Sequence, residues 1–226
     1  MNTRKFAWPR AVLNILGCLL MSIVSTPGMA DPPKHGFPPS LSQLEQAAEL
    51  TAQFNVGWRT VDLYPFDVPF QILYTPNDEN AVNNTGGLYT TFMVSSGTRL
   101  YVPVIYNDNS EPIIGDFPPT GDRDALLHYV FSQEQLGVEY ARITIDGHTT
   151  ALGPKHVVQV AFASPLPDGA TDYQAIAAIL TPLNKGTHTV EISGRVSGAA
   201  LSKPPFPDIF PDGYFEFSTT YTVIVY

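Results

Sequence analysis

Residues Thr187 to Val196 read THTVEISGRV, and their alternation sets the fold class. Val190 and Ile192 fall on one side of an extended chain, whereas Glu191 and Arg195 fall on the other. Successive side chains of a β-strand point to opposite faces, so this period of two predicts a strand. One of its faces is buried and the other is solvated, as in an antiparallel sheet that covers a core.

The sequence on either side of this strand has the same texture from Val56 onward. Short runs rich in Val, Ile, Thr, Tyr and Phe alternate with turn residues, and the last run, Tyr214 to Tyr226, alternates over most of its length. Nine strands with turns between them predict an all-β fold, a two-sheet β-sandwich of immunoglobulin-like or jelly-roll-like type, with a barrel as the alternative. The predicted strands are Gly57 to Leu63, Pro69 to Tyr74, Leu88 to Ser95, Thr98 to Tyr106, Val138 to Asp146, His156 to Ala163, Tyr173 to Leu180, Thr187 to Val196 and Tyr214 to Tyr226.

Two segments break the β texture with helical spacing. Leu41 to Phe54 places apolar residues three and four apart, and Ser42 with Glu45 resembles a capping box, so we predict a short N-terminal helix. Asp122 to Gly137 has a similar spacing and ends in a glycine that can stop a helix, which predicts a short helix or two turns.

The N-terminus has the pattern of an export signal. Arg4, Lys5 and Arg10 precede an apolar run from Ala11 to Val24, which is too short and interrupted for a comfortable membrane span. Small residues then predict cleavage before Asp31, which makes the protein secreted or periplasmic.

A lipoprotein anchored at Cys18 is the alternative, because Ile15 to Cys18 resembles a lipoprotein box. With cleavage before Asp31 the mature chain has no cysteine, hence no disulfide and no thiolate metal site. The predicted organisation is a signal peptide at 1–30, a flexible proline-rich lead at 31–40 and a single domain at 41–226.

The net negative charge of the chain disfavours some classes of binding partner. The chain has a formal charge of −9 with 44% hydrophobic residues, and removing the three basic residues of the signal leaves −12. This acidity disfavours nucleic acid and anionic lipid surfaces as partners, and the hydrophobic content is enough for a core.

Three segments together resemble a group of uncharacterised secreted bacterial β-proteins. They are Gly97 to Ile105, Ile143 to Gly147 and Leu180 to Val190, and the last is similar to the turn and core strand of immunoglobulin-like domains. The resemblance covers Val94 to Tyr226 and implies an immunoglobulin-like sandwich of unknown function. The resemblance assigns no catalytic residue to this chain.

A loop after the strand that ends at Tyr106 is the best candidate for a metal site. Asp108, Asn109 and Glu111 place oxygen side chains close together in a turn, which is the ligand type that calcium prefers. The plain alternative is a turn in which Asn and Asp bond to their own backbone. No other cofactor is expected, since the five histidines form no zinc motif and no phosphate-binding glycine loop occurs.

Two further sets of residues are candidates for cleaving or binding carbohydrate. A glycosidase needs paired carboxylates, and a binding module stacks sugar rings on aromatic side chains. Candidate acids are Asp108, Glu111, Asp146 and Glu216, and candidate aromatic residues are Trp58, Tyr64, Tyr74, Tyr89, Tyr101 and Tyr106.

The sequence thus favours an exported, non-catalytic binding or envelope-associated module whose ligand is a glycan or a protein partner. The alternative is a secreted carboxylate-dependent enzyme that acts on polysaccharide. A structural role is a third hypothesis, in which the long C-terminal strand ending at Tyr226 offers a free edge to a partner strand.

Overall fold

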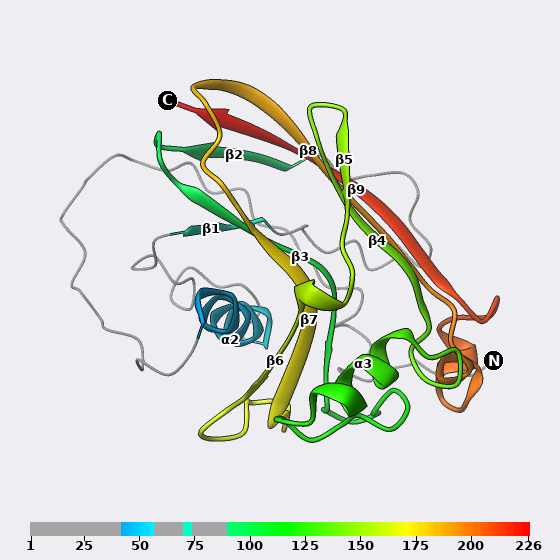
Figure 1. Ribbon diagram of the computed structural model, residues 1–226. Helices are drawn as coiled ribbons and strands as arrows, with labels where there is room; N and C mark the ends of the chain where they lie inside the picture. Colours follow the sequence, from blue (N-terminus) through cyan, green and yellow to red (C-terminus); the bar gives the residue numbers. More distant parts are fainter. Residues whose placement is uncertain (1–41, 57–69, 74–89) are drawn as a thin grey trace, which may run out of the picture.

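The structure, a computed structural model, describes residues 42–56, 70–73 and 90–226. These residues form two mixed sheets of four and five strands and two α-helices (Figure 1). The mostly-β prediction is confirmed, and the arrangement is consistent with a two-sheet sandwich. No helix in these three ranges is long and apolar enough to cross a membrane.

The four-stranded sheet has the order β1-β3-β7-β6, and the five-stranded sheet has the order β2-β9-β8-β4-β5. Each sheet has one parallel pair, β1 with β3 and β2 with β9. The first sheet comprises β1 (Phe70–Ile72), β3 (Arg99–Asp108), β7 (Asp172–Leu180) and β6 (Val157–Ala161). The second comprises β2 (Thr90–Val94), β9 (Phe215–Val225), β8 (Gly186–Val196), β4 (Val138–Ile145) and β5 (His148–Ala151).

Eight of the nine predicted strands coincide with strands of the structure, and the ninth, Gly57 to Leu63, lies outside the described residues. The sequence reading missed β5 because all four of its residues are exposed and show no apolar alternation. A two-residue turn precedes β5. Asp146 and Gly147 both have positive φ, 48° and 83°, as a two-residue hairpin turn requires.

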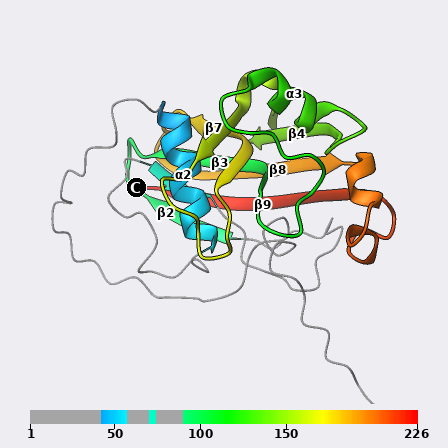
Figure 2. The ribbon, with the colours of Figure 1, turned by 90° about the horizontal axis from the view of Figure 1, so that it is seen from below.

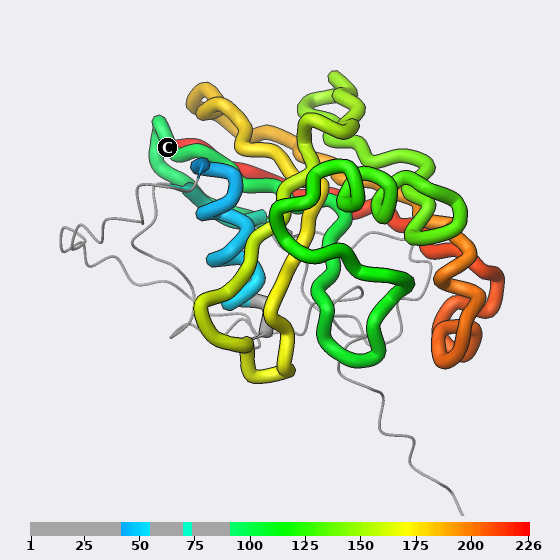
Figure 3. The backbone as a smooth tube through the Cα atoms, turned by 60° about the horizontal axis from the view of Figure 1, so that its bottom comes forward, coloured from blue at the N-terminus to red at the C-terminus, as the bar shows by residue number. Residues whose placement is uncertain are grey.

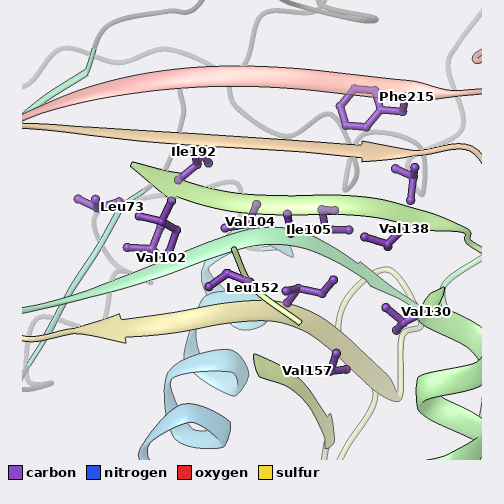
Figure 4. Close-up of a cluster of buried hydrophobic side chains, with 14 of the residues drawn as sticks. Leu73, Val102, Val104, Ile105, Val130, Val138, Leu152, Val157, Ile192 and Phe215 are labelled. Carbon is purple, nitrogen blue, oxygen red and sulfur yellow. The ribbon is translucent and has the colours of Figure 1, made fainter. Parts of the chain in front are cut away.

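The main core lies between the two sheets. Val102, Val104 and Ile105 of β3 face Ile192 of β8 and Phe215 of β9, and Figure 4 shows these side chains filling the space between the strands. Apolar burial on this scale is the dominant favourable contribution to folding.

The helix α2 (Gln43–Val56) covers the other face of the four-stranded sheet (Figure 1). Its small side chains Ala47, Ala48 and Ala52 pack in a second core with Ala175 and Ala177 of β7. This sheet is therefore buried on both faces, which explains the unbroken apolar runs in β3 and β7.

Both helices begin within two residues of the predicted starts, but the second ends at Phe131, well before the predicted stop at Gly137. Ser42 and Glu45 form the expected reciprocal capping box: the Ser42 amide donates to Glu45 Oε2 at 2.6 Å, and the Glu45 amide donates to Ser42 Oγ at 3.2 Å. The second helix, α3 (Arg123–Phe131), is capped by Asp122, which accepts a hydrogen bond from the Ala125 amide. It closes one end of the main core with Leu126 and Val130.

Candidate ligand-binding face

The outer face of the five-stranded sheet is the surface turned away from the main core. Its long strands β8 and β9 run side by side through eleven paired residues (Figure 2). Alternation along these strands sends Val190 and Ile192 inward and leaves polar side chains outside. By register and burial, the outer face consists of Tyr140, Arg142 and Thr144 of β4, Thr149 and Ala151 of β5, Thr189, Glu191, Ser193 and Arg195 of β8, Glu216, Ser218, Thr220, Thr222 and Ile224 of β9, and Thr91 and Met93 of β2.

This face differs from the outer face of the four-stranded sheet, which lies under α2. Neither described helix packs on the outer face, since α2 packs in the second core and α3 contributes Leu126 and Val130 to the main core. Its side chains are exposed or half-buried, and Met93 is 68% exposed. These rows of polar side chains on a solvated sheet face make it the candidate site.

A cluster of charged side chains lies at one end of the outer face. Arg195 lies between two carboxylates, with Nη1 3.2 Å from Glu216 Oε2 and Nε 3.2 Å from Glu139 Oε2. Its guanidinium also covers the ring of Tyr214, with Cζ 4.2 Å from the ring centroid. The cation is therefore neutralised on two sides and held by an aromatic ring.

Tyr140 is joined to this cluster by its hydroxyl, which donates a 2.6 Å hydrogen bond to Glu216 Oε1. Burial first, and then the hydrogen bond and the charge of Glu216, raise the pKa of Tyr140 above its ordinary value, whereas Arg142 and Arg195 oppose the shift. The phenol therefore stays protonated at neutral pH and remains a donor, which fixes its ring on the sheet.

Arg142 lies over that ring, with Cζ 4.4 Å from the ring centroid. Its nearest neighbours across the sheet are small, because the register pairs it with Ser193 on β8 and with Ala151 on β5. Next to it, Thr144 and Thr149 share a hydrogen bond of 2.8 Å between their hydroxyls. The arrangement combines a cation, an aromatic ring and several hydroxyls on one face of the sheet.

The predicted calcium residues lie elsewhere, at the end of β3 in the four-stranded sheet, and the protein already supplies partners to two of them. Asp108 is buried and accepts from the Ser110 amide at 3.0 Å and the Ser110 hydroxyl at 2.5 Å. Asn109 bonds to Thr171 and Asp172 across the neighbouring strand, while Glu111 is exposed. The contacts of Asp108 are those of a self-bonded turn, whereas Asn109 ties the turn to the residues at the start of β7.

The acids that follow the turn have partners of their own. Asp116 accepts from the Gln135 amide group, Asp122 caps α3, and Asp124 lies in the first turn of that helix. Figure 3 traces this connection, residues 109–122, as it folds beside α3. No three His, Cys, Asp or Glu side chains within the described ranges are grouped so that they could hold a metal ion.

Two of the four acids predicted for glycoside hydrolysis, Asp146 and Glu216, lie far apart along the sheet. Asp146 bonds to the Thr189 amide of β8, and Glu216 pairs with Arg195, six residues further along the same strand. At about 3.3 Å per residue the two carboxylates are roughly 20 Å apart. Both known glycosidase geometries require separations below about 10 Å. Asp108 ends β3 of the other sheet, and Glu111 lies in the loop that follows it.

Of the six aromatic residues predicted for a sugar-stacking platform, the structure describes Tyr101 and Tyr106. Tyr101 is fully buried under α2, and Tyr106 is half-buried against Tyr173. Trp58, Tyr64, Tyr74 and Tyr89 lie outside the described residues. The tyrosines that do reach the outer face, Tyr140 and Tyr214, were missed. The alternation of Tyr140, Arg142 and Thr144 along one strand is the signal that could have found them.

The C-terminal half of β9 is not the free edge that was predicted, whereas residues 215–220 pair only with β8 among the described residues. Residues 221–225 of β9 pair in parallel with β2, and the Tyr226 amide donates to the Val94 carbonyl. The last residues of the chain therefore lie inside the five-stranded sheet, and they cannot accept a partner strand without displacing β2.

At the opposite end of the same sheet, His188 joins two loops. Its Nδ1 is 2.7 Å from Asp146 Oδ2, and its Nε2 is 2.8 Å from the Asn184 carbonyl oxygen. Both partners only accept, so the geometry favours the imidazolium with two N–H donors. The hydrogen bond with Asp146 is the largest cause that raises the pKa of His188, and the same bond is the largest cause that lowers the pKa of Asp146.

This pair should make stability depend on pH. A raised folded-state pKa of His188 adds stability below its unfolded value, near 6.5, and that stability disappears as the pH rises through the folded value. The lowered pKa of Asp146 adds stability that is present above its unfolded value and is lost in acid. We expect His188→Gln to destabilise by about 0.5–1 kcal/mol at pH 5.5, and by less at pH 8.5. Denaturant unfolding at both values measures this.

The matched control is His128→Gln, which removes an exposed imidazole from α3. A His188→Gln deficit that stays constant between pH 5.5 and 8.5, or that appears equally in the control, would contradict the role of the ion pair.

Comparison with known proteins places the chain in no family. No family model matches it, and no curated protein matches it. Two solved structures are weakly similar: PbICP-C in complex with falcipain-2 (12% identity, TM-score 0.30, 69% of this chain and 99% of that one) and amebosin (14% identity, TM-score 0.26, 70% of this chain and 100% of that one). Their TM-scores are too low to carry an argument about this chain.

Proposed function

We propose that this protein is an exported, non-catalytic binding module that holds a glycan on the outer face of the five-stranded sheet. The observation that carries the proposal is the contrast between the two sheets. A helix covers one of them, whereas the other presents hydroxyl, aromatic and charged side chains in register on a solvated surface.

The chemistry of the outer face suits a sugar. Serine and threonine hydroxyls donate and accept, as sugar hydroxyls do, and they occur on β4, β5, β8 and β9 at neighbouring positions of the register. Tyr140 supplies an apolar surface beside them, and its own hydroxyl is fixed by Glu216. Such a face can bind without any chemical step.

A carboxylate-dependent enzyme that acts on polysaccharide is the alternative. It would need two acids that converge in a concave site, and Asp146 and Glu216 lie roughly 20 Å apart along the sheet. Arg195 and Tyr140 also engage Glu216, which leaves that carboxylate occupied rather than poised for proton transfer.

Two finer assignments belong to the same proposal. The sandwich would be immunoglobulin-like or jelly-roll-like, supported by its two sheets of antiparallel strands with one parallel pair in each. Export would leave a mature chain that begins at Asp31, or a lipid-anchored one that begins at Cys18, and the intact mass of the exported protein distinguishes them.

The test is a thermal-unfolding screen of the full chain, expressed with its own leader, against soluble cell-wall and plant-type glycans. A ligand at about 100 times its dissociation constant stabilises by roughly 2.7 kcal/mol, which raises Tm by about 5–10 °C at this size. We expect such a shift with at least one glycan, and no shortening of that glycan over hours.

Two matched variants locate the site. Ser193→Ile adds bulk without hydrogen bonds in the middle of the outer face, and Ser164→Ile makes the same change in the exposed loop after β6. We expect only Ser193→Ile to abolish the shift. A shift that survives in Ser193→Ile, cleavage of the glycan, or a panel without any shift would overturn the proposed function.

A further inference from the structure

We propose that the ligand of the outer face carries carboxylate groups, as in a polysaccharide of uronic acids, and that Arg142 binds one of them through its guanidinium. This inference rests on the proposed function and names the class of ligand. It begins from a cation that the fold leaves without a partner on an otherwise acidic protein.

Arg142 differs from the other arginines in the described part of the chain. Arg99 bonds to Gln43, Arg123 donates to the carbonyls of Val157 and Pro154, and Arg195 pairs with Glu139 and Glu216. Among these four, Arg142 alone makes no hydrogen bond or ion pair, and its only contact of this kind is the ring of Tyr140. Its guanidinium donors all remain available.

The neighbouring residues of the sheet hold the Arg142 guanidinium in place. The ring of Tyr140 lies under it at 4.4 Å, and the Tyr140 hydroxyl is tied to Glu216 at 2.6 Å. A guanidinium stacked on a fixed ring loses less conformational freedom on binding than a free side chain does. Planar bidentate donors suit a carboxylate, which accepts two parallel hydrogen bonds.

The surroundings leave room for a sugar around that carboxylate. Ser193 and Ala151, which flank Arg142 in the register, are small, and Arg142 itself is exposed. The hydroxyls of Ser193, Thr144 and Thr149 lie within the same part of the face. A uronic acid ring offers a carboxylate and hydroxyls together, which matches this set of donors and acceptors.

The local arrangement of charges at the two arginines supports the same ligand, against the overall acidity of the chain. At Arg195 the protein supplies two carboxylates to a guanidinium stacked on Tyr214. At Arg142 it supplies the stacked guanidinium and no carboxylate. The ligand would complete at Arg142 the pairing that the protein already completes at Arg195.

The test compares a polygalacturonate oligosaccharide with its methyl ester, using the full chain and calorimetric titration in the presence of a chelator. The ester keeps the ring and the hydroxyls and loses the negative charge, and the chelator excludes binding mediated by calcium. We expect the acid to bind at least tenfold more tightly than the ester, with a preference that falls as salt rises.

Variants assign the preference to Arg142. Arg142→Gln should bind acid and ester alike, and Arg142→Lys should keep only part of the preference because it lacks the planar pair of donors. Arg99→Gln removes the same charge from the opposite sheet and should keep the preference intact. Circular dichroism and Tm establish that each variant is folded.

The outcomes separate this inference from the proposed function. If wild type binds the ester as tightly as the acid, or if Arg142→Gln keeps the preference, the inference is overturned, while binding that Ser193→Ile abolishes would still support the outer face as the site. If neither compound binds, and alginate oligosaccharide does not bind, uronates are excluded, and the glycan panel decides the proposed function alone.

Discussion

Replacing Gly198 with alanine is expected to destabilise the protein by roughly 3 kcal/mol or more. A Cβ on Gly198 would lie 1.9 Å from the Gln135 carbonyl oxygen and 2.5 Å from the Leu136 carbonyl carbon. Both atoms are backbone, and they cannot move like the end of a side chain. The backbone of Gly198, at φ −71°, is ordinary, so space alone requires glycine here.

The substitution would disturb more than one contact, because the segment around Gly198 is hydrogen-bonded to the turn between α3 and β4. Amides of Ser197, Gly198 and Ala199 donate to carbonyls of the turn between α3 and β4, at 2.8–3.0 Å. Shifting the segment by the distance that a methyl group needs would break several of these hydrogen bonds together. Chemical denaturation, with the midpoint and the slope fitted together, measures the loss.

Gly153→Ala is the matched control for this substitution. Its backbone, at φ −139°, accepts any residue, and a Cβ there meets nothing within 4 Å. We expect a change within about 0.5 kcal/mol. If Gly198→Ala is as stable as Gly153→Ala, the close approach of these two segments is wrong.

Two buried tyrosines should respond oppositely to removal of the hydroxyl. Tyr129→Phe is expected to cost about 1–3 kcal/mol, because the Tyr129 hydroxyl accepts from Asn107 at 2.8 Å and donates to the Ile114 carbonyl at 2.8 Å. Both partners would remain in the interior without it. Tyr101→Phe is expected to be neutral or stabilising by up to about 1 kcal/mol, because the buried Tyr101 hydroxyl has no hydrogen-bond partner among the described residues.

The Tyr129 hydroxyl belongs to a buried hydrogen-bond network, and the Tyr101 hydroxyl does not. Gln174 of β7 donates to Asn107 of β3, and Asn107 donates to Tyr129 of α3, so the chain of hydrogen bonds ties the helix to the four-stranded sheet. Burial is the main cause that raises the pKa of both phenols, so neither ionises in the neutral range. Equal losses of stability in the two Phe variants would contradict this account.

Much of the fold could be predicted, because apolar and polar residues alternate along a strand that has one face in solvent. In β8 the polar side chains Glu191 and Arg195 mark the solvated face, and the strand is predicted within one residue at its start. The strands β3 and β7 are apolar on both faces, since α2 covers one side, and no pattern within them predicts that covering helix as a third layer. The short strand β5 has no apolar residue inside the core and gives no signal.

The candidate site was less readable, because it depends on pairing between distant strands. Nothing local to Arg142 indicates that Ser193 and Ala151 lie beside it, and nothing local to Glu216 indicates that Tyr140 bonds to it. Conversely, Asp108 and Asn109 form a conspicuous cluster in the sequence, yet in the structure they bond to Ser110, Thr171 and Asp172.

The most direct test of the central claim, that the ligand lies on the outer face of the five-stranded sheet, is a map of backbone amide shifts by NMR. The probe is the glycan that gives the largest thermal shift. We predict perturbations along residues 140–144 and 191–195, which meet in the register around Arg142 and Ser193. Perturbations confined to α2 and β6, on the far side of the molecule, would contradict the account.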